Sequence, residues 1–306
     1  MNDLFTYNLL QVYLLPTTKT LAIDIKDTDQ NKTLTHELLF ELESILSWAF
    51  DKIEICSIIL GNEKTTSFQK THQYLNQDKE YLAKLHSRLF DLNRLILKVP
   101  QTVIVDLGEG ASGQDIDLFL AADIRIAHKS GGLFFNYLSQ GILPYHSHQL
   151  LSNAVGMARA SQWILAGKKV SHQEAEQAGL IFVLYDETNV IDQKNALLTA
   201  IFEQMPVTRI QAKLALNRNL LLILEAGQSE DFKILQGTLV AEEWKMAPLK
   251  QKTRSTQLTA ANGQTTLAKN QANSLSTKTH HHENKQAQIL PFRRLKNKDK
   301  DIDSSP

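Results

Sequence analysis

Apolar residues recur with two spacings along the first 250 positions, and each spacing predicts a different kind of element. In residues 34–50 and 82–99 they repeat every three or four positions, which is typical of helices with one buried face. Short apolar runs at 9–15, 21–25 and 53–60 predict strands, the first two forming a hairpin. The chain therefore alternates strands and helices, as α/β proteins do.

The alternation continues beyond residue 130 and becomes mainly helical. Ser171 and Glu174 have the spacing of a capping box at the start of a helix. Gly179 suits the left-handed αL conformation that commonly ends a helix. The remaining pattern predicts strands at 133–135 and 180–185 and helices at 147–155, 158–165, 189–204 and 207–226, with a further helix at 232–246.

In residues 102–127 an apolar strand, a glycine-rich turn, a short helix and a second strand follow one another directly. Gly108, Gly110 and Gly113 permit positive φ angles, which a strand that reverses into a helix requires. The first N–H groups of the helix, near Gln114, point back at the turn and can stabilise an oxyanion or a phosphate. The alternative is an ordinary connection whose glycines serve only the turn. No Walker or dinucleotide-binding motif is present.

Three segments together resemble the crotonase superfamily of enoyl-CoA hydratases and isomerases. They are residues 102–127, the Gly141-Ile142-Leu143-Pro144 loop and residues 164–180, ILAGKKVSHQEAEQAGL, and the likeness extends over about residues 8–225. The resemblance implies an α/β fold, a crotonase-like spiral of repeated ββα units at 1–200 with a C-terminal helical region for trimerisation at 201–250. A homotrimer or a dimer of trimers is expected.

Crotonase relatives hold the thioester oxygen of an acyl-CoA with two backbone N–H groups. Carried over by position, the resemblance places these donors at Leu60 and Gln114, with Gly61 and Gly113 beside them in the substrate site. It also places Lys32 near the CoA nucleotide. The coenzyme A thioester is the expected substrate, and no separate cofactor or metal is expected.

Hydratases of this family use two glutamates as acid and base, and here the matching positions read Asp117 and Tyr137. The chain is therefore a divergent member that lacks the usual catalytic glutamates. Asp117 keeps a carboxylate on a shorter side chain, whereas Tyr137 cannot act as a base near neutral pH unless its pKa is strongly lowered. Nearby substitutes are Glu109, Asp115, Tyr145, His146 and His148. Asp123 is interpreted as structural.

Composition narrows the other possibilities. Residues 251–306 hold ten Lys and Arg against four Asp and Glu with few apolar residues, which predicts a disordered basic tail. The whole chain has no net charge, so residues 1–250 are acidic, which argues against nucleic-acid binding. The tract at 280–282, three histidines, could hold a metal ion loosely but is interpreted as incidental.

One cysteine, Cys56, lies in an apolar run, so an intrachain disulfide is impossible and a buried thiol is expected. The apolar residues near the N-terminus are interrupted by Gln11 and end at Pro16, which fits a strand and neither a signal peptide nor a membrane span. We therefore expect a cytoplasmic protein. Two functions stay open: an acyl-CoA enzyme of the hydratase/isomerase class, and a non-catalytic binding or scaffolding protein that kept the fold.

Overall fold

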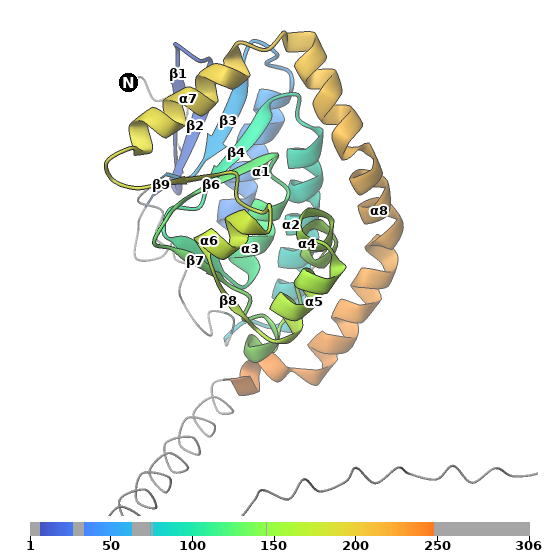
Figure 1. The fold of residues 1–306 in the computed structure, drawn as a ribbon. Coiled ribbons are helices and arrows are strands. Elements are labelled where there is room, and N and C mark those ends of the chain that lie inside the picture. The colour runs from blue at the N-terminus through green and yellow to red at the C-terminus, as the bar shows by residue number, and fades with distance from the viewer. Residues whose placement is uncertain (1–6, 27–33, 63–73, 75, 145, 248–306) are drawn as a thin grey trace, which may run out of the picture. The chain divides into compact units, whose positions relative to one another are not determined.

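The computed structural model describes residues 7–26, 34–62, 74, 76–144 and 146–247 (Figure 1). Within them, six strands form a large sheet in the order β1-β2-β3-β4-β6-β9. The β1–β2 hairpin is antiparallel, as predicted, and the other neighbouring strands are parallel. The strands are β1 Leu10–Leu15, β2 Thr20–Ile25, β3 Ser57–Leu60, β4 Thr102–Asp106, β6 Ile124–His128 and β9 Val183–Tyr185.

A second, smaller sheet follows from the glycine-rich turn. Its strands are β5 (Gly110–Ser112), β7 (Gly132–Phe134) and β8 (Lys169–Ser171), with β7 in the middle. β8 was not predicted, because three residues with one apolar side chain give no readable alternation. The small sheet continues directly into the helix that follows the turn, so it positions the predicted site.

Helices cover both faces of the large sheet (Figure 1). α1 (His36–Phe50) and α2 (Lys79–Lys98) contribute to the main apolar core, whereas Leu198 and Ile201 of α7 (Val190–Phe202) join a smaller cluster that includes β3 and β4 side chains. The other helices are α3 Gln114–Leu120, the 3-10 helix η1 Leu138–Gln140, α4 Ser147–Val155, α5 Met157–Leu165, α6 His172–Gln177 and α8 Pro206–Ala241.

Local signals set several of these boundaries. The Ser171 hydroxyl accepts a hydrogen bond from the Glu174 N–H at 3.1 Å, so the predicted N-cap of α6 is confirmed. Gly179 has a φ of 80°, as the predicted left-handed stop requires. The strand predicted at 53–60 is shorter than expected, because Ile53 lies in a turn with 66% of its surface exposed.

The prediction of separate helices at 207–226 and 232–246 is wrong, because α8 runs unbroken from Pro206 to Ala241. A glycine inside a helix usually costs about 1 kcal/mol relative to alanine. At Gly227 the absent side chain makes room for Gln149, since a Cβ there would lie 2.8 Å from the Gln149 amide nitrogen. Tertiary packing therefore overrides the local signal. In the described part of the chain, every helix is too short or too polar to span a lipid bilayer.

Candidate functional site

The turn between β5 and α3 brings a backbone N–H group to the edge of the small sheet. Gly113 caps α3 with a φ of 54°, and its own N–H donates to the Phe134 carbonyl at 2.9 Å. The N–H of Gln114, the first residue of α3, has no partner within the helix. Gly113 carries the positive φ angle and Gln114 does not, so the glutamine adds no backbone strain here.

Asp117 and Tyr137, the two predicted catalytic residues, contact each other in the protein interior. The Tyr137 hydroxyl donates a hydrogen bond to a carboxylate oxygen of Asp117, and both side chains are at most 1% exposed. Burial raises the pKa of the Tyr137 phenol well above its ordinary value, and the Asp117 charge raises it further. The phenol therefore keeps its proton at neutral pH and acts as a hydrogen-bond donor, not as a base.

A second carboxyl group, Asp115, lies in the same interior region. Its side chain is 1% exposed, and neither carboxylate oxygen has a hydrogen-bond partner among the described residues. Burial raises the pKa of Asp115 well above its ordinary value, and the charge of Asp117 adds to this effect. Two carboxyl groups with one favoured in its protonated form are a chemical arrangement suited to proton transfer.

The Gln114 side chain turns inward and meets a buried histidine of α2. Its amide nitrogen lies 3.1 Å from Nε2 of His86, which is 1% exposed. Burial, and then the nearby His146, lower the pKa of His86 to about 3, so the ring is neutral at physiological pH. A neutral Nε2 accepts the hydrogen bond from the amide, and this contact fixes the side chain of the residue that supplies the turn N–H.

His146 completes the interior polar cluster. It has an unusual positive φ of 48° directly before α4, and its ring packs on Phe90 at a centroid distance of 4.2 Å. Its Nδ1 lies 2.9 Å from a carboxylate oxygen of Asp231 in α8. Burial lowers the pKa of His146 to about 4, against the opposing influence of Asp231. The ring is therefore a neutral, oriented imidazole.

The structure does not favour Leu60 as an oxyanion donor. Leu60 ends β3 inside the parallel sheet, paired in register with Ile23 on one side and Val105 on the other. The Gly61 N–H donates to the Ile23 carbonyl on β2 at 2.9 Å. Because successive amides of a strand point to opposite neighbours, the Leu60 N–H is directed at β4. Neither amide is directed at a substrate in this conformation.

The remaining predicted residues are structural, exposed or outside the described part of the chain. Asp123 accepts the Val103 N–H at 2.8 Å and pairs with Lys213 at 2.7 Å, as its structural interpretation requires. Cys56 is buried and free. Glu109 is exposed and His148 has 43% of its side chain exposed, so neither joins the interior cluster. Lys32, Tyr145, the histidine tract at 280–282 and the 251–306 tail lie outside the described residues.

Two members of the cluster were not predicted from the sequence. His86 falls on the helical stripe of α2, where a lone histidine has the same pattern as any core position. Asp231 is 85 positions from its partner His146, and no local motif links the two. The cluster as a whole joins one backbone N–H donor, three carboxyl groups, a protonated phenol and two neutral imidazoles. This set can stabilise an oxyanion and move a proton.

Comparisons with known proteins point to one family. A family model described as enoyl-CoA hydratase/isomerase matches residues 18–259. A Bacillus subtilis (strain 168) protein, an enoyl-CoA hydratase by name, is 32% identical over 183 residues, which cover 57% of this chain and 70% of the relative. YngF of the same organism is 28% identical over 150 residues, and the chain spans only 58% of that relative's length.

Solved structures share the fold. The crystal structure of enoyl-CoA hydratase from Bacillus halodurans matches with a TM-score of 0.71 and 20% identity, covering 78% of this chain and 98% of that chain. An enoyl-CoA hydratase/isomerase from Pseudoalteromonas atlantica T6c matches with a TM-score of 0.68, 20% identity and coverages of 81% and 98%. The predicted α/β architecture and the resemblance to the crotonase superfamily are thereby confirmed.

Proposed function

Because the chain belongs to the enoyl-CoA hydratase/isomerase family, we propose that it binds an acyl-CoA thioester at the turn between β5 and α3. The observation that carries this proposal is the Gln114 N–H at the start of α3, which Gly113 caps with a positive φ angle, with the Asp117 carboxylate three residues further along the helix. The sequence likeness to the family and the position of Asp117 in the helix that starts at this turn support it together. The proposed reaction class is hydration or isomerisation of an enoyl-CoA.

In this proposal the Gln114 N–H donates to the thioester oxygen as negative charge develops there. One well-aimed backbone donor of this kind contributes about 3 kcal/mol to a transition state. The Gly113 conformation aims the amide, and the contact of the Gln114 side chain with His86 holds the residue in place. Leu60 is not part of the proposal, because its amide is directed into the sheet.

Asp117 is the proposed group that takes or gives the proton at the acyl chain. Tyr137 holds the carboxylate by a hydrogen bond and keeps its own proton, because burial raises its pKa. His146, oriented by Asp231, is the proposed second proton-transfer group in place of the family's second glutamate. A neutral imidazole of this kind suits a base that accepts a proton from water.

One observation favours the alternative, a binding or scaffolding protein without catalysis. The hydroxyl of Tyr137 and the carboxylate of Asp117 satisfy each other inside the protein. A carboxylate held in this way needs a rearrangement before it can reach a substrate. The fold and the turn N–H suffice to hold a thioester, so ligand binding is common to both functions.

Incubation of the purified protein with short-chain and long-chain enoyl-CoAs, followed by the loss of the conjugated thioester absorbance, tests the enzyme. Turnover by the wild type and its loss in Asp117→Ala support the proposal, whereas equal rates in both remove Asp117 from the mechanism. Calorimetry with CoA and a non-hydrolysable acyl-CoA separates the two functions. Binding without turnover supports the scaffold, and no heat with either ligand excludes an acyl-CoA pocket.

Self-association into a homotrimer or a dimer of trimers is part of the same proposal. α8 exposes several large apolar side chains in the single chain, which is unusual for a surface that faces only water. These are Val207, Leu216, Leu222, Ile223, Ile234 and Val240, each at least 54% exposed. Analytical ultracentrifugation at micromolar concentration tests the assembly, and a monomer as the sole species contradicts it.

A further inference from the structure

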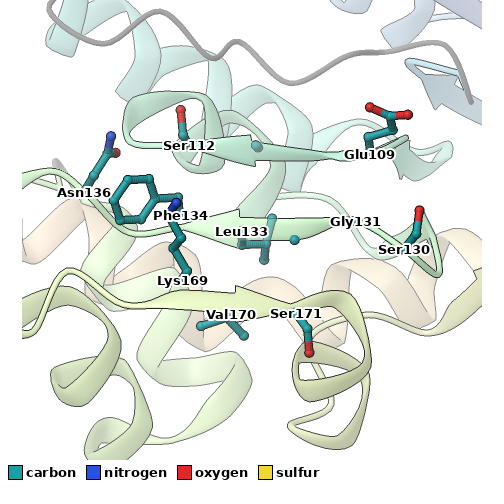
Figure 2. A pocket seen from close by; sticks show the side chains of 12 residues that line it. Glu109, Ser112, Ser130, Gly131, Leu133, Phe134, Asn136, Lys169, Val170 and Ser171 are labelled. Carbon is teal, nitrogen blue, oxygen red and sulfur yellow. The ribbon is translucent and has the colours of Figure 1, made fainter.

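A groove of about 730 Å³ lies over the small sheet (Figure 2). Asn136 lines this groove, whereas the next residue, Tyr137, faces Asp117 in the interior. The groove and the cluster therefore lie on opposite sides of the same short segment. Its volume is within the range of pockets that hold small organic ligands.

The register of the small sheet arranges the groove in two rows. Ser112, Phe134 and Lys169 are paired across the three strands, and their side chains lie together at one end of the groove (Figure 2). The second row, two residues away along the strands, consists of Gly110, Gly132 and Ser171. Because side chains of a strand alternate between its faces, the residues between the rows point into the core.

Glycines keep the floor of the groove open. A Cβ at Gly110 would lie 1.9 Å from the Gly132 carbonyl oxygen, and a Cβ at Gly131 would lie 2.2 Å from the Glu109 carbonyl oxygen. No larger residue fits at either position without moving the backbone. The strands thus approach closely, and the space above them stays free of side chains.

The end of the groove at β8 carries a positive charge without a counter-ion. The Lys169 ammonium lies 4.9 Å from the centre of the Phe134 ring and makes no ion pair with any described residue. The preceding Lys168 differs, because it pairs with Glu174 at 2.6 Å. Lys169 is exposed on β8 and can attract an anion, and Ser112 of β5 lies in the same row on the far side of Phe134.

The remaining polar groups accept hydrogen bonds. At the opposite end of the groove lie Glu109 and the hydroxyls of Ser130 and Ser171 (Figure 2). This set suits a ligand that carries several hydroxyl donors.

We infer that the groove binds a phosphorylated polyhydroxyl compound, either a sugar phosphate or a nucleotide. The phosphate lies at Lys169, and the hydroxyls donate to Glu109 and the serines. The two rows are about 7 Å apart along the strands, and a pentose phosphate separates its phosphate from its ring hydroxyls by a comparable span. This site is independent of the proposed acyl-CoA site and stands if that proposal fails.

Titration calorimetry of the full chain with AMP, ribose 5-phosphate and adenosine tests the site. We expect both phosphates to bind and adenosine to bind at least about 10-fold more weakly, because an ionic hydrogen bond is roughly twice as strong as a neutral one. Lys169→Met weakens AMP binding by about 10-fold or more, and Lys169→Arg restores it to within a few-fold. Tighter binding of AMP than of ribose 5-phosphate identifies a nucleotide, and equal binding identifies the sugar phosphate.

Lys168→Met is the matched control, because it removes a neighbouring positive charge that is already paired. It leaves AMP binding within about 2-fold. Equal losses in the two lysine variants indicate general electrostatic attraction and overturn the inference, as does the absence of heat with both phosphates. If wild type and Lys169→Met bind AMP equally, and an acyl-CoA analogue displaces the AMP, then AMP occupies a different site. This result also overturns the inference.

Discussion

The Nδ1 atom of His146 lies 2.9 Å from a carboxylate oxygen of Asp231, although 85 positions separate the two residues. The contact joins the start of α4 to the C-terminal half of α8 and fixes the plane of a buried imidazole. His148, two positions further along the chain, also approaches Asp231, at 3.8 Å, but 43% of its side chain is exposed. The same carboxylate therefore serves one buried and one exposed histidine.

Asp231→Asn should lower kcat for an enoyl-CoA by about 10-fold or more with a small change in KM, because the imidazole loses the charge that orients it. It should also change the pH profile of kcat. Steady-state kinetics from pH 5 to 9 measure both. His148→Gln is the control, since it removes the exposed partner of Asp231 and should leave the profile unchanged. Equal profiles for wild type and Asp231→Asn contradict a proton-transfer role for His146.

Tyr137→Phe should lower the free energy of unfolding by about 1–3 kcal/mol, because it removes a buried donor from the Asp117 carboxylate. Urea denaturation measures the change. Tyr13→Phe provides a comparison at a more accessible tyrosine–aspartate contact, where Tyr13 donates to Asp24 at 3.1 Å, and it should cost less. An equal loss of unfolding free energy in both variants contradicts the prediction that the buried contact stabilises the protein more than the accessible one.

Asp115→Asn should stabilise the protein, and the gain should grow with pH. The folded-state pKa of Asp115 is raised, so its contribution to stability is complete below about pH 4 and is lost as the pH rises toward that raised pKa. An asparagine of the same shape avoids this loss, which amounts to about 1.4 kcal/mol per pH unit. Unfolding free energies at pH 5 and pH 8 test the trend, and a constant difference contradicts it.

Acid should destabilise the protein partly through His86. Burial lowers the folded-state pKa of His86 to about 3. The contribution of the neutral ring to stability is therefore complete above about pH 6.5 and is lost as the pH falls from there toward 3. The His86→Gln variant should therefore have a shallower loss of stability between pH 6 and pH 4, by about 1.4 kcal/mol per pH unit. Denaturation curves at intermediate pH values measure the slopes, and parallel slopes exclude the effect.

Lys213→Ala should destabilise the fold by about 3–5 kcal/mol, because it leaves Asp123 without its buried partner. The Lys213 ammonium lies 2.7 Å from Asp123 and also donates to the carbonyls of Ile96 and Gln101. Lys233→Ala is the control on the same helix, since Lys233 forms an exposed pair with Glu230. Thermal denaturation measures the loss of stability in both variants. A similar small loss in each contradicts the prediction.

The sequence allowed the turn and its short helix to be predicted because all the signals there are local. Gly113, Gln114 and Asp117 lie within five positions, and their spacing alone sets which backbone amide precedes which carboxylate. Tyr137 was placed near them by resemblance, and the observed contact agrees with that placement. Short-range geometry is readable from residue order.

Two features could not be predicted from local pattern. Successive amides of a strand point to opposite neighbours, so the direction of the Leu60 amide follows from the hydrogen bond that Gly61 donates to β2. A run of apolar residues does not indicate which strand will accept that bond. The continuity of α8 through Gly227 depends on Gln149, which lies in a different helix. In both cases a partner distant in sequence decides the outcome, and so it does for His146 and Asp231.

α8 has 36 residues without a break, about 54 Å along its axis, and curves around one side of the molecule (Figure 1). Near its start Lys213 binds the carbonyl of Gln101, directly before β4, and pairs with Asp123, and nearer its other end Asp231 holds His146. One continuous helix therefore connects these two attachment points. Any contact that shifts the N-terminal half of α8 therefore also displaces the carboxylate beside His146, which makes the helix a mechanical link between the outer surface and the interior polar cluster.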